Sequence, residues 1–175
     1  MELIAITPPE ILENEVRRIV QLLDGGKISR IHIRHPRVDE RIIRKLLESI
    51  PPMYYPRLSL HDSHHLAAEY CLGGVHLNGR NPMVPGDFTG LVSRSCHSAV
   101  EVYDSEGLDY VFLSPVFDSI SKPGYQSAFA PAELRNILAQ ARVRVYALGG
   151  VTPERLPELE SLGFYGAAML GAAWR

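Results

Sequence analysis

Short apolar runs alternate with longer amphipathic segments along this chain, and this alternation limits the possible folds more than any other feature. Runs of strand character occur at residues 3–7, 30–35, 57–62, 74–77, 91–97, 110–117, 145–150 and 166–170. Most of the segments between them carry apolar residues three and four positions apart, which is typical of helices: residues 9–26, 39–50, 63–73, 98–107, 130–141 and 152–163. Residues 78–90 differ, because two prolines and three glycines predict a loop with at most one helical turn.

Regular strand–helix alternation predicts a parallel sheet covered by helices. Eight strands favour a (β/α)8 TIM barrel over a six-stranded doubly wound sheet. The 175 residues, of which 46% are hydrophobic, predict a single domain over residues 1–175 with a substantial core. Barrels of this type usually need about 200 residues or more, whereas this chain stops at Trp174 and Arg175 directly after the last strand. We therefore expect a missing or truncated eighth helix, and a possible homodimer in which a partner subunit covers the gap.

Charge and composition exclude several classes of function. The net charge of -2, the pI near 6.4 and the lack of a run of Lys or Arg argue against nucleic-acid binding. The amino terminus has an acidic residue and only a short apolar run, which predicts a cytoplasmic protein without a secretory signal or membrane span. Cys71 and Cys96 lack the spacing of a disulfide framework or a zinc site, so we expect two reduced thiols.

Polar side chains gather at the predicted carboxyl ends of the strands, where barrels of this type carry their active sites. Because side chains alternate along a strand, His32 and Arg34 share one face, and Ser95 shares a face with His97. This polar face is expected to point to the barrel axis. His97 is either a hydrogen-bonded structural residue or a functional acid/base. Arg34 either anchors an anionic ligand or pairs with a carboxylate such as Asp62.

The segment "HDSHH" at residues 61–65 suggests a metal site, but the position of two of its histidines at a predicted helix start argues against one. Ser63 is expected to cap a helix whose first residues, His64 and His65, face solvent or the neighbouring turn. We therefore expect no dedicated transition-metal site there. Asp62 is different, because a single carboxylate suits Mg2+ when phosphates supply further ligands.

Glycines follow the last two predicted strands, at Gly149 and Gly150 and again at Gly171. In barrels of this type the corresponding turns often bind phosphate through backbone N–H groups. The alternative is that these glycines only permit tight turns. The loop at residues 118–131 carries Lys122, and it either closes over a substrate and brings the lysine to a phosphate or is a solvated surface loop.

The order and spacing of these segments resemble the thiamine phosphate synthase and TenI superfamily, with TenI-type thiazole tautomerases the closer match. The segments that carry the resemblance are "MELIAIT", "IHIR", "SRSCHS", "GLDYVFLSPVF", "ALGGVTPERL" and "GAAMLG". The resemblance implies a barrel that binds a phosphorylated thiazole, with the phosphate held at Gly149, Gly150 and the backbone of Met169, Leu170 and Gly171.

For the synthases, the resemblance implies a Gln-x-Arg-x-Lys pattern on the second strand and Mg2+ held by two aspartates. In this chain the three positions of the pattern are occupied by His32, Arg34 and Pro36, so only the arginine matches. Asp62 matches the first aspartate, Asn81 lies at about the second, and Lys122 matches a lysine near the pyrophosphate.

For the tautomerases, the resemblance makes His97 the acid/base, since it falls on the histidine of a Ser-x-His-Ser motif. An imidazole with a pKa near 6.5 can accept and return a proton near neutral pH, and no metal or redox cofactor is needed. Arg34 would hold the carboxylate and Ser95 would position His97. Three hypotheses stay open: a thiazole tautomerase, a thiamine phosphate synthase with Mg2+, and a regulatory barrel that binds thiazole phosphate without chemistry.

Overall fold

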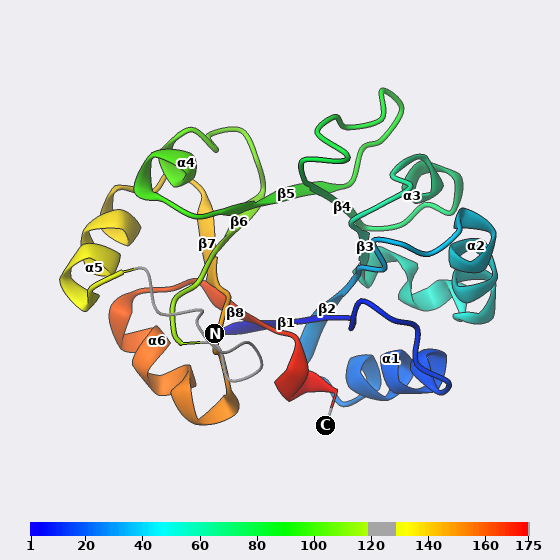
Figure 1. Cartoon of the computed structure of the whole chain (residues 1–175), viewed down its shortest axis with the longest axis horizontal. Coiled ribbons are helices and arrows are strands. Elements are labelled where there is room, and N and C mark those ends of the chain that lie inside the picture. Colours follow the sequence, from blue (N-terminus) through cyan, green and yellow to red (C-terminus); the bar gives the residue numbers. More distant parts are fainter. Residues whose placement is uncertain (119–128, 175) are drawn as a thin grey trace.

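A computed structural model describes residues 1–118 and 129–174 of the chain. Eight parallel strands close into a barrel in the order of the sequence, with the last strand paired to the first (Figure 1). The strands are β1 (Glu2–Ile6), β2 (Ile28–Ile33), β3 (Leu58–Leu60), β4 (Gly74–Leu77), β5 (Leu91–Cys96), β6 (Tyr110–Leu113), β7 (Arg144–Ala147) and β8 (Gly166–Met169). The predicted TIM barrel is confirmed.

Helices surround the barrel on its outer face (Figure 1). They are α1 (Glu15–Asp24), α2 (Glu40–Ser49), α3 (His65–Glu69), α4 (Ala99–Tyr103), α5 (Pro131–Gln140) and α6 (Leu156–Leu162), with short 3-10 helices η1 (Pro52–Arg57), η2 (Pro153–Arg155) and η3 (Gly171–Ala173). The connection from β4 to β5 contains no helix, as its prolines and glycines predict. Among the described residues η3 alone follows β8, which fits the expected truncation of the eighth helix. The Trp174 indole N–H donates to the Ile6 carbonyl at 2.7 Å and thereby fixes the end of the chain to β1.

Local sequence explains where several elements begin and end. The Asp39 side chain accepts from Arg41 N at 2.8 Å before α2, and Ser98 accepts from Glu101 N at 3.2 Å before α4, so both act as N-caps. The expected strand at residues 110–117 ends at Leu113, because Pro115 has no N–H for the ladder. The expected strand at residues 145–150 likewise ends at Ala147, before two glycines with positive φ.

The buried side chains form two layers. The larger layer lies between the strands and the surrounding helices. The smaller layer fills one side of the barrel interior with apolar and aromatic side chains: Ile4, Ile6, Tyr110, Phe112, Tyr146 and Ala168. The interior beside β2–β5 is polar, because the register pairs His32 with Ser59 and His76 with Ser93, and all four residues are buried. The expectation that polar side chains of these strands face the axis is confirmed.

None of the helices in the described part of the chain combines the length and the apolar character needed to cross a membrane.

Candidate functional site

Two arginines and one aspartate lie at the carboxyl ends of β2, β3 and β4, which form one side of the barrel mouth. The Asp62 Oδ1 atom accepts from Arg80 Nε at 3.0 Å, from Arg80 Nη2 at 2.9 Å and from Asn81 Nδ2 at 3.0 Å. The expected alternative of an Arg34–Asp62 pair is therefore wrong, because Arg80 occupies the carboxylate. The half-buried Arg34 side chain has no hydrogen bond or ion pair with any described residue. Its charge is thus available to an anionic ligand.

The residues around Asp62 do not fit a Mg2+ ion. Mg2+ is octahedral and takes oxygen ligands, yet the guanidinium of Arg80 already lies against Asp62. Asn81 turns its amide nitrogen, and not its oxygen, toward Asp62, since the amide N–H groups donate to Asp62 and to the His61 carbonyl. Asp62 Oδ2 is buried without a hydrogen-bond partner. A cation beside this carboxylate is already present, in the form of Arg80.

His97 lies directly after β5 and its side chain is 65% exposed. Its ring Nδ1 is 3.5 Å from Glu101 Oε2, and its backbone N–H donates to the same oxygen at 2.6 Å. The carboxylate of Glu101 thus holds both the ring and the backbone of His97 in place. Ser95 does not position His97 as expected, because its hydroxyl instead lies 3.0 Å from His76 Nε2.

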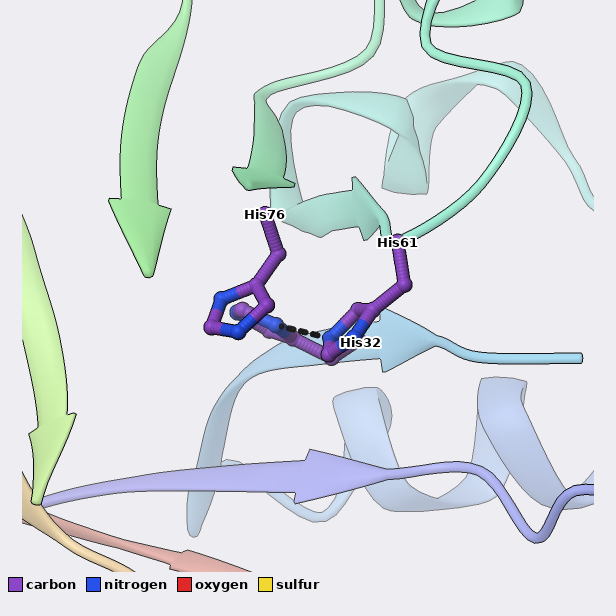
Figure 2. Close-up of side chains that lie close together, drawn as sticks. All are labelled: His32, His61 and His76. Carbon is purple, nitrogen blue, oxygen red and sulfur yellow. Dashed lines mark hydrogen bonds between the residues drawn. The ribbon is translucent and has the colours of Figure 1, made fainter. Parts of the chain in front are cut away.

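Three histidines from neighbouring strands meet in the barrel interior, below the mouth (Figure 2). We call His32, His61 and His76 the histidine cluster. Nδ1 of His32 lies 2.9 Å from Nε2 of His61, and the His61 and His76 rings stack with centroids 4.1 Å apart. Tyr110 Oη lies 2.7 Å from His32 Nε2. His32 is completely buried with both ring nitrogens bonded, so contact with a substrate would require one of these bonds to be exchanged.

Burial disfavours the charged form of all three imidazoles. It lowers the pKa of His32 and of His61 well below the ordinary value, and it lowers that of His76 to about 3. The positive charge of Arg34 adds to this effect on His61 and His76. The histidine cluster is therefore neutral at neutral pH.

The prediction for the "HDSHH" segment was wrong for Ser63 and His64. Ser63 has a φ of 51° and makes no cap, and the buried His64 ring has Nε2 3.1 Å from the His76 carbonyl. His65 is exposed, as expected. The segment turns inward here because His61 and His64 both find polar partners on β2 or β4.

The glycine turns after β7 and β8 present backbone N–H groups at the mouth. Gly149 and Gly150 have φ of 92° and 63°, and a Cβ on Gly150 would lie 2.4 Å from the Asp118 carbonyl oxygen. No described residue accepts a hydrogen bond from the N–H of Gly149, Gly150 or Gly171. Backbone packing thus requires glycine at positions 149 and 150 but not at 171, and the free N–H groups of all three glycines are suited to an anion. Met169 ends β8 beside them, and Leu170 precedes η3.

The structure brings together some of the predicted residues and adds others. Arg34, Asp62, His97 and the glycine turns all lie at the carboxyl ends of the strands, whereas Lys122 lies outside the described residues. Sequence reasoning missed Arg80, His76 and Tyr110 as members of the site. The alternation in "GVHL" places His76 on a defined face, but only the closed barrel shows what that face meets.

Comparison with known proteins adds independent evidence. The sequence model of the family described as thiamine monophosphate synthase matches residues 3–173. A solved thiamine phosphate pyrophosphorylase from Bacteroides thetaiotaomicron is 36% identical, with a TM-score of 0.88 over 99% of this chain and 85% of that protein. The thiamine-phosphate synthase of Caldivirga maquilingensis is 28% identical over 91% of this chain and 81% of its own length.

Other matches are shorter. The thiamine-phosphate synthase of Levilactobacillus brevis is 30% identical over 62% of this chain, and that match spans 54% of its length. The match to the synthase of Salinibacter ruber spans 47% of its length. The chain thus matches about half of the length of these two curated relatives.

The fold and the mouth define a (β/α)8 barrel protein with an unpaired arginine and free backbone N–H groups at the carboxyl ends of its strands. The family model covers nearly the whole chain, and the B. thetaiotaomicron protein agrees over 99% of it. The chain belongs to the thiamine monophosphate synthase and TenI family.

Proposed function

We propose that this protein is a thiamine-phosphate synthase, which joins a thiazole phosphate to hydroxymethylpyrimidine pyrophosphate and releases pyrophosphate. The observation that carries the proposal is the unpartnered guanidinium of Arg34 at one side of the mouth, with the free N–H groups of Gly149 and Gly150 at another. Two separate anion-binding positions suit two phosphorylated substrates. The names of the relatives favour this reaction over an isomerisation.

The arginines have a defined role in this reaction. When the bond between the pyrimidine methylene carbon and the pyrophosphate oxygen breaks, negative charge grows on the leaving group while the thiazole nitrogen bonds to that carbon. Positive groups fixed before the reaction stabilise such charge. Arg34 is unpaired, and Arg80 is held in place by Asp62. The resemblance to the synthases implies Mg2+, but because the Asp62 region does not fit this ion, we assign these roles to the arginines alone.

Arg34→Gln tests the proposal, because it removes the charge and keeps most of the volume. Loss of a hydrogen bond to a charged group costs about 1.5–3 kcal/mol, so kcat/KM for thiamine phosphate formation should fall about 10- to 150-fold. The matched control is Arg37→Gln, an exposed arginine further along the connection from β2 to α2, which should leave kcat/KM unchanged. The measurement is conversion of thiazole phosphate and the pyrimidine pyrophosphate to thiamine phosphate, with and without added Mg2+. A protein that forms no thiamine phosphate under either condition contradicts the proposal.

A second candidate is the thiazole tautomerase, which the position of His97 favours. His97 is exposed at the mouth and lies beside Glu101, as a residue that exchanges protons with a ligand should. Supplying the non-aromatic thiazole carboxylate phosphate distinguishes this activity. Turnover that is lost in His97→Asn would support the tautomerase, and equal turnover in His97→Asn would eliminate the role of this residue. Saturable binding of thiazole phosphate without turnover in either assay would instead indicate a regulatory barrel.

A further inference from the structure

The histidine cluster has no part in the proposed reaction, yet it brings three imidazoles together in the barrel interior. One ligand nitrogen from each of the three residues lies within 4.8 Å of the others, and all three residues are buried. Figure 2 shows the rings converging from β2, β4 and the end of β3. Each strand contributes one histidine, so the arrangement depends on the closed barrel and not on any local motif.

We propose that the histidine cluster is a binding site for a divalent transition metal, with zinc as the best match and water as the fourth ligand. Imidazole nitrogen is a preferred ligand of zinc, and three protein ligands with one water are common for this ion. His61 is the most exposed of the three residues at 5%. Water can therefore approach from the mouth beside it.

The distances require only modest rearrangement for two of the ligands. Zinc–nitrogen bonds of about 2.0–2.1 Å at a tetrahedral angle place two ligand nitrogens about 3.3 Å apart. His32 Nδ1 and His61 Nε2 are 2.9 Å apart, so they must separate by a few tenths of an ångström. The metal then replaces the proton that these two nitrogens share.

His76 must move more than the other two histidines. Its ring stacks on that of His61 with an interplanar angle of 22°, so its nitrogens do not yet point at the shared position. Its two nitrogens lie 2.9 Å from Ser93 Oγ and 3.0 Å from Ser95 Oγ. Rotation of the ring releases one serine and leaves the other to orient the second nitrogen.

Residues around the cluster resemble the outer partners that orient metal ligands. Such partners hold the second ring nitrogen of a histidine and fix which nitrogen faces the metal. Tyr110 does this for His32, since its Oη lies 2.7 Å from Nε2 and leaves Nδ1 directed at the cluster. Neutral imidazoles are also the form that binds metals. The positive charges of Arg30 and Arg34 act against a cation here.

The test is titration of the metal-stripped full chain with Zn2+ by calorimetry, and with Co2+ by its visible absorption, both in the absence of substrates. We expect one equivalent to bind, with the absorption of tetrahedral Co2+. His61→Asn should weaken binding at least tenfold, and Tyr110→Phe should weaken it about 10- to 100-fold. The matched control is His65→Asn, which removes an exposed histidine with a side chain 57% accessible and should bind like the unmodified protein.

Further measurements keep the outcome decisive. Affinity should change little between pH 8 and pH 6, whereas a site of exposed histidines would lose affinity as protons compete near pH 6.5. Arg34→Gln should tighten binding, because it removes a repelling charge. Circular dichroism checks that each variant folds. If His61→Asn does not fold, Tyr110→Phe is the variant that tests the proposal. Absence of saturable binding, or equal affinity in Tyr110→Phe and the unmodified protein, would overturn the proposal.

Discussion

A buried pair of side chains near the mouth allows a quantitative prediction of stability. Glu15, the first residue of α1, has Oε1 at 2.7 Å from His35 Nε2, and its Oε2 accepts from Leu12 N at 3.0 Å. The side chains of His35 and Glu15 are 0% and 1% exposed. One carboxylate thus joins the segment after β1 to the segment after β2.

Replacing this carboxylate by alanine removes the partner of the buried His35 ring and of the Leu12 N–H, and Leu12 is exposed, so that its N–H can bond to water instead. A buried donor that loses its partner costs about 1–3 kcal/mol, so Glu15→Ala should lower the free energy of unfolding by about 1–3 kcal/mol. For a chain of this size each kcal/mol lowers the melting temperature by about 2–4 °C, which gives a fall of roughly 2–12 °C. Glu15→Gln keeps an oxygen acceptor and should cost less.

The assay is urea denaturation followed by far-ultraviolet circular dichroism, with thermal melting as a second measurement. Glu13→Ala is the matched control, because Glu13 is an exposed neighbour in the same segment and its loss should change stability by less than about 0.5 kcal/mol. If Glu15→Ala loses less than about 1 kcal/mol, or no more than Glu13→Ala, the pair does not stabilise the loops as inferred.

Two further predictions concern the glycine turns and pH. Gly150→Ala should lower the free energy of unfolding by at least about 1–2 kcal/mol, because φ is 63° and the new Cβ meets the Asp118 carbonyl oxygen at 2.4 Å. Gly171→Ala is the control and should be nearly neutral in the same denaturation experiment, because no atom lies within 4 Å of its new Cβ. Equal losses of stability in the two variants would contradict this reasoning. The histidine cluster has lowered pKa values in the folded state, so below about pH 6.5 the unfolded chain binds more protons than the folded chain. The free energy of unfolding therefore decreases as the pH is lowered, by up to about 1.4 kcal/mol per pH unit for each histidine. Urea unfolding at pH 7 and pH 5 measures this, and His61→Asn should reduce the slope; equal stability at both pH values would show that the cluster is not held neutral.

The fold could be predicted because its signals are local. Eight apolar runs separated by helical periodicity define a (β/α)8 barrel. The boundaries were less accurate. The run at residues 110–117 resumes its apolar character after Ser114 and Pro115, but β6 ends at Leu113 because Pro115 cannot donate to the ladder.

The candidate site could be predicted only in part. Position at a strand end correctly brought Arg34, Asp62 and His97 to the mouth. The alternative in which Arg34 pairs with Asp62 was wrong, since the partner is Arg80, which lies 18 positions along the chain in a loop whose path has no periodic signal. The prediction that His64 faces solvent or the neighbouring turn was also wrong, because its partner is a carbonyl of β4 that the sequence does not place beside it.

By itself, the sequence determined the number and order of the strands and which side chains share a face. These properties depend on backbone periodicity, and each is fixed by residues only a few positions apart. The tertiary structure decided which polar atoms meet. His32 and His61 are 29 positions apart in the sequence, and their nitrogens lie 2.9 Å apart only because β2 and β3 pair and the barrel closes around them. That contact, and the site that we propose around it, depends on the closure of the whole sheet and not on any segment of the chain.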